Sequence, residues 1–200
     1  MIRAVRGYEK AVWQGLTQME ERKFGVDEIL RNLGSGRYLM LQFKAPWPSS
    51  IVDTDYKFSI NTQQHLTLEQ GPCRICPGSA FYVLPLFSTW KKVYSYLPFL
   101  VQDTWLLKAK DVNLTTYPSL QQRHRLEIRK KNSRIPSAKI FSPEINAEIM
   151  NASQVFHEPS DFVPKETWLP SGVLREWVRS VIGQFPYYRF RGLHALFTPE

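Results

Sequence analysis

The sequence predicts an α/β (α+β) fold, with a mixed central sheet flanked by helices and followed by a C-terminal extension. Three patterns lead to this prediction. Apolar residues repeat at the helical period through residues 3–23, as in an amphipathic helix. Residues 24–30, 37–45 and 55–60 have the composition and alternation of strands, and the glycine-rich GSG between the first two marks a turn. Residues 80–87 form a near-continuous apolar run, which is typical of a strand buried on both faces.

A short helix is expected between the third and fourth of these strands. Asn61 or Thr62 can cap its start, and Gly71 can end it. The predicted order is therefore helix, three strands, helix, strand. Another helix is expected over 88–97, because this segment begins with a Ser-Thr pair suited to a helix cap.

The later part of the chain gives weaker patterns. Residues 104–112 and 124–131 have the composition of strands, and 143–152 are a candidate helix. Residues 171–185 predict an amphipathic helix with one apolar face.

The length of 200 residues fits one domain with an appended subdomain. A stretch rich in Pro and Ser begins near residue 132. We therefore predict a core over 1–131, and over 132–200 a linker with a C-terminal helical extension that packs on the core.

The composition indicates a globular, basic protein. The chain is 43% hydrophobic, enough to bury a core, and carries a formal net charge of +8. This charge favours a polyanionic partner, either nucleic acid or an anionic membrane surface. The sequence has no run of about 18 apolar residues and no signal-peptide stretch at its start. We therefore expect a cytoplasmic protein that does not associate with a membrane.

Two cysteines, Cys73 and Cys76, form a CxxC pair in the loop GPCRICPG. A zinc site needs more ligands, and the four histidines do not have the spacing of a zinc finger. Pro77 and Gly78 follow at once, which disfavours a redox-active CxxC that opens a helix. We interpret the pair as reduced thiols in a loop.

Polar residues interrupt the second of the predicted strands, in the segment GVDEILRNLGSGRYLMLQFKAP (25–46). Alternation places Gln42 and Lys44 on one side of this strand, and Leu39 and Leu41 on the other. We expect the leucine side to pack on a helix. The alternative for Gln42 and Lys44 is an ordinary polar face of an edge strand.

The hairpin can bring an acidic residue to the same place. If Gly34 and Ser35 form a two-residue turn, Asp27 lies directly opposite Gln42. Asp27, Gln42 and Lys44 then converge within one cross-strand spacing, roughly 5 Å between Cβ atoms.

This group of side chains suits metal-assisted phosphodiester chemistry. Glu20 or Glu21, at the end of the first predicted helix, could reach the same point. A solvated last helical turn is the alternative for both, and it is the interpretation we favour for Glu20. Carboxylate, amide and backbone oxygens are ligands that Mg²⁺ accepts together with water. A neighbouring lysine can orient the attacking water and stabilise charge on the phosphate.

The arrangement resembles the PD-(D/E)XK restriction-endonuclease-like nuclease superfamily in its D…QxK form. That superfamily has a core ordered helix, three strands, helix, strand, and its signature is an acid at one strand end followed by (D/E/Q)xK on the next strand. The resemblance covers residues 3–87 and identifies Asp27 as the first acid, with Gln42 and Lys44 as the second half. Glu21 matches the helix glutamate of some branches, with Glu20 as the near alternative.

The resemblance implies a nuclease that depends on Mg²⁺ or Mn²⁺, with DNA preferred to RNA and a role in bacterial defence. Asp27, Glu21 and Gln42 would hold the metal, and Lys44 would orient the water. Gln63 or Gln64 stands where RecB-like branches place a glutamine.

Two departures from the family pattern leave an alternative open. Val26 replaces the proline of the motif, and Gln42 replaces the usual acid and removes one negative charge from the metal site. The alternative is a nucleic-acid-binding or assembly protein on an inactive nuclease-like fold. The sequence does not decide between a homodimer and a partner subunit.

A basic segment, QQRHRLEIRKKNSR (121–134), predicts contacts to a phosphate backbone. Strand alternation places three of its arginines on one side. The residues expected to bind nucleic acid, with Gln63 added from the short helix, are Arg123, Arg125, Arg129, Lys130, Lys131 and Gln63. The alternative is a charged edge strand that discourages aggregation.

Overall fold

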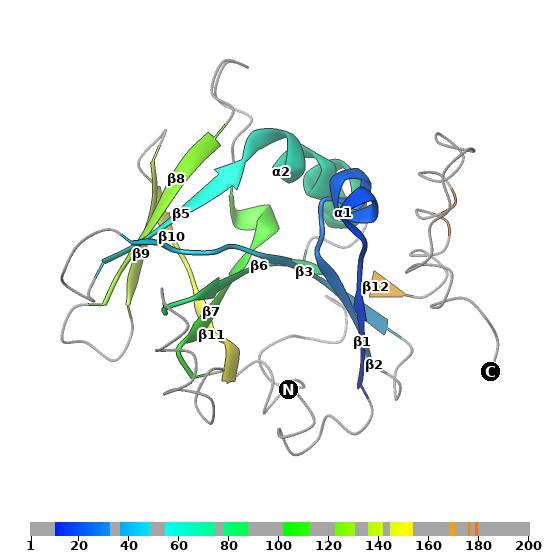
Figure 1. Ribbon diagram of the computed structural model, residues 1–200, viewed down its shortest axis with the longest axis horizontal. Coiled ribbons are helices and arrows are strands. Elements are labelled where there is room, and N and C mark those ends of the chain that lie inside the picture. Colours follow the sequence, from blue (N-terminus) through cyan, green and yellow to red (C-terminus); the bar gives the residue numbers. More distant parts are fainter. Residues whose placement is uncertain are drawn as a thin grey trace.

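The structure is a computed structural model of the chain, and two sheets and two helices form its centre (Figure 1). It describes residues 11–32, 37–48, 55–74, 78–87, 102–112, 123–130, 136–141, 145–153 and 169–170, with the single positions 176 and 179.

The larger sheet has seven strands within these ranges, in the order β1-β2-β3-β6-β7-β11, with β12 paired to β3. Its strands are β1 (Ala11–Gly15), β2 (Glu28–Asn32), β3 (Arg37–Phe43), β6 (Ala80–Pro85), β7 (Thr104–Lys108), β11 (Met150–Asn151) and β12 (Leu169–Pro170). β3 and β6 are parallel and the other pairs are antiparallel, so the sheet is mixed, as predicted. The apolar run at 80–87 forms β6, whose residues Phe81 to Leu84 are all buried.

The second sheet has five strands in the described part of the chain, in the order β10-β9-β8-β5-β4. Its strands are β4 (Trp47–Pro48), β5 (Asp55–Asn61), β8 (Arg123–Arg129), β9 (Ser137–Phe141) and β10 (Ile145–Ala147). The third predicted strand is β5, so it does not extend the hairpin sheet but pairs with β8. Its strict alternation of buried and half-buried residues suits an antiparallel sheet that faces the core on one side only. β8 and β9 pair across the domain boundary predicted at 131.

Part of the helix predicted at 3–23 is wrong: residues 11–15 form a strand, and residues 3–10 lie outside the described residues. Ala11–Gly15 pairs with β2 as β1, and α1 spans Gln18–Phe24. The start is fixed by a capping box between Thr17 and Glu20, a signal present in the sequence. Gly25 ends the helix, as expected, with φ 70°.

The second helix, α2 (Thr62–Leu68), begins as predicted. The Asn61 side chain caps it by accepting a hydrogen bond from the Gln64 backbone N–H at 3.0 Å. A π-helical turn, η3 (Glu69–Cys73), follows, and non-helical backbone angles at Gly71 break the regular helix there. A 3-10 turn, η5 (Ala109–Asp111), follows β7.

The candidate helix at 143–152 is wrong. This segment forms β10, which pairs with β9, and β11, which pairs with β7, so sheet pairing overrides a weak helical pattern. The helix predicted at 88–97 lies outside the described residues, and of the helix predicted at 171–185 only Glu176 and Arg179 are described, both helical.

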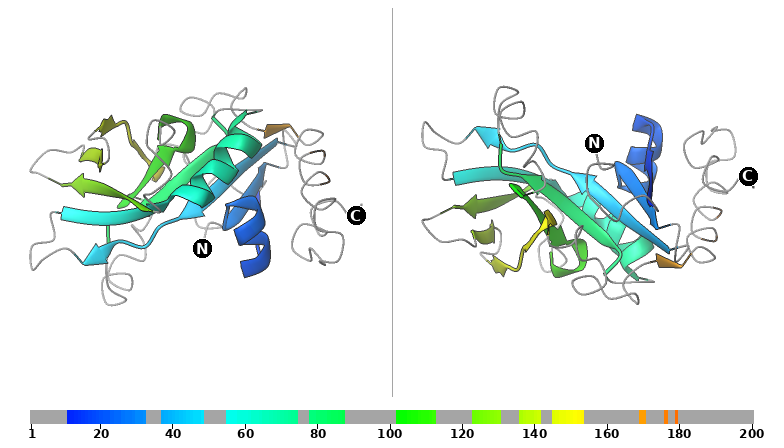
Figure 2. Two further views of the ribbon diagram at one scale, coloured as in Figure 1. Left: turned by 90° about the horizontal axis from the view of Figure 1, so that it is seen from above. Right: turned by 90° about the horizontal axis from the view of Figure 1, so that it is seen from below.

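One hydrophobic core joins both sheets and both helices. It includes Met40 and Tyr82 from the larger sheet, Phe58 from the smaller one, and Phe24 and Leu68 from the helices. Seen from above, α2 lies over the larger sheet (Figure 2). Among the residues that the structure describes, no helix is long and apolar enough to cross a membrane.

Candidate active site

The β2–β3 hairpin has the register predicted from the sequence. Glu28 lies opposite Leu41, and the same register continues to place Asp27 opposite Gln42. Backbone hydrogen bonds extend the ladder on both sides of these strands: Asp27 N–H donates to the Leu41 carbonyl (2.9 Å), and Lys44 N–H donates to the Val83 carbonyl of β6 (3.0 Å). The backbone around the candidate site is therefore fixed by the sheet.

Asp27 and Gln42 contact each other directly. Asp27 Oδ2 accepts hydrogen bonds from Gln42 Nε2 and from the Phe43 backbone N–H, each at 2.6 Å. Gln42 is only 3% exposed, so this is a buried polar group with its partners in place. Gln42 and Lys44 lie on the side covered by α2, whereas we expected the helix on the side of Leu39 and Leu41, which are also buried.

Gln64 of α2 connects the two halves of the QxK pair. Its Nε2 donates to Gln42 Oε1 at 2.6 Å, and its Oε1 accepts from Lys44 Nζ at 2.5 Å. Gln63, the neighbour named among the expected contacts, is exposed instead. The Asn61 cap sets the rotation of the helix, and with His65 and Leu68 buried, Gln64 is the glutamine that faces the sheet.

The two glutamates of α1 have different surroundings. Glu20 is 1% exposed and its Oε2 accepts from the Thr17 N–H and hydroxyl, both at 2.8 Å, so it holds the helix start. The expected solvated last turn is therefore wrong for Glu20. Glu21 is half-buried, and its pKa is raised by burial and by the nearby negative charge of Asp27. The structure thus brings the charge of Asp27 close enough to raise the pKa of Glu21, and burial together with the same charge raises the pKa of Glu28.

Burial shifts the pKa of both charged groups at the centre. The pKa of Asp27 is raised by burial, although the bonds from Phe43 and Gln42 and the charge of Lys44 lower it. Burial lowers the pKa of Lys44 to about 8, against the opposing effect of the Asp27 carboxylate. Groups with such shifted pKa values are concentrated at functional sites.

An aromatic residue and a histidine, neither predicted as central, lie behind Lys44. Lys44 Nζ is 5.6 Å from the ring centroid of Tyr82, which is opposite Gln42 on β6. The Tyr82 hydroxyl and His65 Nδ1 are hydrogen-bonded at 2.9 Å. His65 is 1% exposed, and burial lowers its pKa to about 4. The sequence does place Tyr82 near this site, because it is the polar-tipped residue of the apolar run 80–87, which forms the strand parallel to β3.

The donor set has the chemistry that a hard cation accepts. Asp27 and Glu21 supply neighbouring carboxylates, and Asp27 Oδ1 accepts no hydrogen bond from the described residues. No group of three or more His, Cys, Asp or Glu residues that could hold a metal occurs in the described part of the chain. Two carboxylates fit Mg²⁺, which usually keeps several waters and takes phosphate oxygens as ligands. Gln42 does not complete this set as it stands, because its nitrogen faces Asp27 and its oxygen accepts a hydrogen bond from Gln64.

The predicted basic residues lie on the second sheet. Arg123, Arg125 and Arg129 are exposed on one side of β8, as strand alternation predicted. β8 lies between β5 and β9, so the alternative of a charged edge strand is wrong. Lys130 pairs with Asp103 at 2.9 Å, and Lys131 lies outside the described residues.

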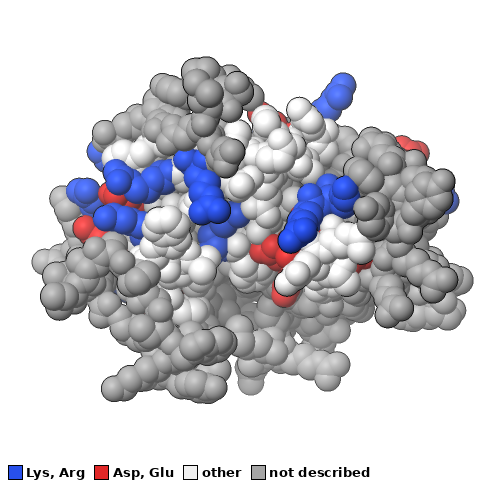
Figure 3. Space-filling model, turned by 45° about the horizontal axis from the view of Figure 1, so that its top comes forward, with Lys and Arg blue, Asp and Glu red and all other residues white. Residues whose placement is uncertain are grey.

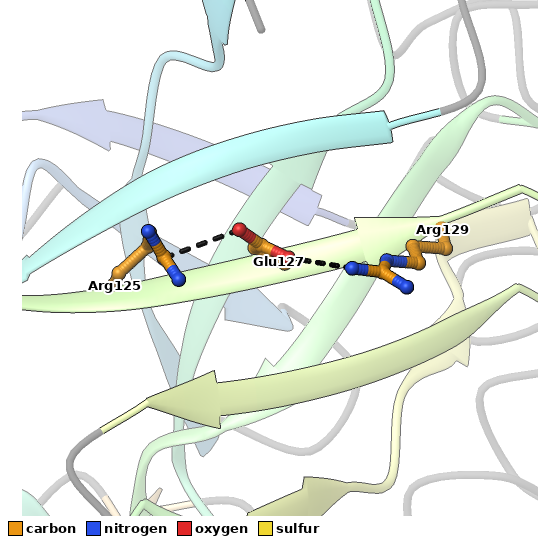
Figure 4. Close-up of polar contacts among 3 residues, drawn as sticks. All are labelled: Arg125, Glu127 and Arg129. Carbon is orange, nitrogen blue, oxygen red and sulfur yellow. Dashed lines mark hydrogen bonds and ion pairs between the residues drawn. The ribbon is translucent and has the colours of Figure 1, made fainter. Parts of the chain in front are cut away.

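The basic side chains form two groups on the face shown in Figure 3. The larger one is on the left, where Figure 1 places the five-stranded sheet, and a smaller one is right of the middle, beside an acidic group. Glu127 lies between Arg125 and Arg129 on β8, at 3.1 and 3.4 Å, and holds both (Figure 4).

Comparison with known proteins adds no further constraint, because no protein-family model, no curated protein and no solved structure matches the chain. The candidate function therefore rests on the geometry of Asp27, Gln42, Lys44 and Gln64.

Proposed function

We propose that the protein is a metal-dependent nuclease that hydrolyses phosphodiester bonds, with DNA as the preferred substrate, and that its core is restriction-endonuclease-like. The observation that supports this most is one hydrogen-bonded group: Asp27 bonds Gln42, Gln42 bonds Gln64, and Gln64 bonds Lys44. The group brings together the carboxylate of Asp27, the amide of Gln42 and the amine of Lys44. These are the side chains that the D…QxK resemblance implies.

Asp27 and Glu21 are the residues that would hold Mg²⁺ or Mn²⁺. Gln42 would join them only if its amide turned over, because its oxygen now accepts from Gln64 and its nitrogen faces Asp27. Such an ion, when bound, neutralises phosphate charge and lowers the pKa of water. The raised pKa values of Asp27 and Glu21 support this role, because two neighbouring half-buried carboxylates are stabilised by a cation between them.

Lys44 would act on the water and the phosphate. Its amine is held by Gln64 and lies over the face of Tyr82, so it is positioned without being neutralised by a direct ion pair to Asp27. From there it can donate a hydrogen bond to the attacking water and stabilise the charge that develops on the phosphate oxygens. Gln64 is a positioning residue, because it fixes Gln42 and Lys44 relative to each other.

The direct test is cleavage of plasmid DNA and of single-stranded circular DNA by the purified protein with Mn²⁺. We expect cleavage that EDTA stops, that is lost in Lys44→Ala and Asp27→Ala, and that persists in Gln70→Ala, the control at an exposed glutamine of η3. Cleavage that is unchanged in Lys44→Ala would overturn the mechanism.

A second candidate is a nucleic-acid-binding or assembly protein with an inactive form of the same site. The observation that favours it is the glutamine at position 42, which leaves Asp27 and Glu21 as the carboxylates of the group. Calorimetry separates the two: the nuclease binds Mn²⁺ through Asp27, whereas the inactive protein binds nucleic acid with no dependence on divalent metal.

A further inference from the structure

The outer face of the five-stranded sheet carries an excess of positive charge. Strand pairing puts the following described charged residues on that face: Asp55, Lys57, Arg123, Arg125, Glu127, Arg129 and Lys139. Within the described part of the chain these are five cations and two carboxylates, a net charge of +3. The opposite face of the same strands is buried, with Phe58, Leu126 and Ile140 in the core.

The cations are arranged around one carboxylate. Glu127 holds Arg125 and Arg129 along β8, and the register places Lys57 on one side of it and Lys139 on the other. Glu127 has a side chain only 9% exposed, while Arg125 and Arg129 remain 55% and 49% exposed. The carboxylate thus spaces the two arginines, and both remain exposed. Arg125 and Arg129 are roughly 13 Å apart along the strand.

Aromatic groups lie on the same face at both sides of these cations. Trp47 of β4 is 58% exposed and lies opposite Lys57. On β9, the Phe141 ring is 4.5 Å from the Arg125 guanidinium. Three strand spacings, roughly 14 Å, separate β4 from β9, with the basic groups between them. Aromatic faces and guanidinium planes that flank cations are what unpaired bases stack on.

Two covalent connections join this face to the candidate active site. β4 begins three residues after Lys44, so Trp47 is at most about 10 Å along the chain from it. β5 ends at Asn61, the cap of α2, which carries Gln64. A strand bound across the sheet is thus near the residues proposed to cleave it.

We propose that the outer face of the five-stranded sheet binds single-stranded nucleic acid, with bases stacked on Trp47 and on the Arg125–Phe141 pair and phosphates on the surrounding lysines and arginines. A duplex is disfavoured as occupant because its bases are already stacked and paired, so Trp47 would have no face to contact. This inference rests on the proposed function only for the cleavage of the bound strand. Binding itself needs neither metal nor Lys44.

The test is fluorescence anisotropy of a labelled oligothymidylate of about 15 nucleotides, a length near the upper site size of a single-strand-binding fold, in EDTA. A duplex of the same length serves as the competitor. We expect tighter binding to the single strand, and a loss of about 10-fold in affinity for Trp47→Leu, which keeps an apolar side chain but removes the stacking face. Trp47→Phe should retain most of the affinity. Arg129→Ala, which removes one of the cations proposed to bind phosphate, should lower the slope of log affinity against log salt by about 0.7.

Controls keep the outcomes separate. Lys110→Ala removes one exposed positive charge from η5, away from this face, and should leave binding and its salt slope nearly unchanged. Equal affinity for single strand and duplex, or an unchanged affinity in Trp47→Leu, would overturn the inference. Absence of binding in EDTA with Mn²⁺-dependent cleavage intact would overturn it and leave the proposed nuclease standing. Binding to the single strand without any cleavage would support this inference and overturn the proposed nuclease.

Discussion

Lys44 is the residue at which function and stability oppose each other. Its pKa of about 8, lowered mainly by burial, means that between pH 8 and its ordinary value of 10.5 the unfolded chain binds more protons than the native one. The free energy of unfolding should therefore rise with pH across that window, and below pH 8 the native state bears the full cost of burying the ammonium. That cost is about 3 kcal/mol.

Lys44→Met should relieve this cost. We expect the variant to gain about 2 kcal/mol in free energy of unfolding at pH 7, since the lost bond to Gln64 offsets part of the relief, and to lose cleavage. Urea unfolding measures the first effect, with Lys110→Met, on the surface, as the matched control. A variant less stable than the wild type would show that Lys44 stabilises the fold.

His65 should make the protein sensitive to acid. Its pKa is lowered from 6.5 to about 4 by burial first, and also by the charges of His124 and Lys44, while the Val112 backbone raises it. Because the unfolded chain binds a proton between pH 6.5 and 4 that the native chain does not, stability should fall as the pH falls through this range. The loss should reach about 3 kcal/mol.

The measurement is urea unfolding at pH 7 and pH 4.5 on the wild type and on His65→Phe. His65→Phe loses the hydrogen bond to Tyr82 at both pH values. The difference in free energy of unfolding between pH 7 and pH 4.5 should nevertheless be smaller in the variant than in the wild type. If His65→Phe lost as much free energy of unfolding between pH 7 and pH 4.5 as the wild type, other groups would cause the acid sensitivity.

At the scale of elements, Gly25 sets the distance between α1 and α2. Its φ is 70°, and a Cβ placed there would lie 2.9 Å from the Gln64 carbonyl oxygen and 3.3 Å from Thr67 Cβ. Gly25→Ala should therefore cost about 2 kcal/mol in stability, from the left-handed backbone and the close approach together. Because the obstruction is at Gln64, the variant should also lose cleavage at temperatures where it remains folded.

Gly15→Ala is the matched control, since a Cβ there meets nothing within 4 Å. Thermal unfolding and plasmid cleavage on both variants test the prediction. Equal effects of the two substitutions would contradict the proposed contact between Gly25 and α2.

The elements with strong local signals were predictable. The hairpin register followed from alternation and turn length, β6 from its apolar run, and the α2 start from Asn61. The β1 segment was not, because Val12 fits a helical period as well as a strand, and only pairing with β2 distinguishes the two. The TxxE capping signal at Thr17 was in the sequence and was overlooked.

The candidate site could be predicted in part for the same reason. Asp27 and Gln42 meet through neighbouring strands, which short-range rules describe. Gln64 and Tyr82 reach Lys44 from elements more than 15 residues away in the chain, so their contacts depend on how α2 and β6 pack on β3. The sequence patterns placed β5 in the sheet of the hairpin, which was wrong, because its partner β8 is far along the chain.

At the scale of the whole molecule, metal binding should stabilise the fold. A ligand that binds only the native state raises the free energy of unfolding, by about 2.7 kcal/mol at 100 times its dissociation constant. We expect Mn²⁺ to raise the melting temperature of the wild type at neutral pH, and not that of Asp27→Asn. Glu148→Gln, at an exposed position, changes the charge equally and should respond like the wild type. If Mn²⁺ raised the melting temperature of Asp27→Asn as much as that of the wild type, the ion would bind at another site.

The direct passage from β5 into α2 limits how this chain can vary. Asn61 and Gln64 are three residues apart, so one inserted residue between them would rotate the glutamine by about 100° around the helix axis and away from the amine it orients. Related chains that keep the chemistry should therefore accept length changes in surface turns yet preserve this three-residue step.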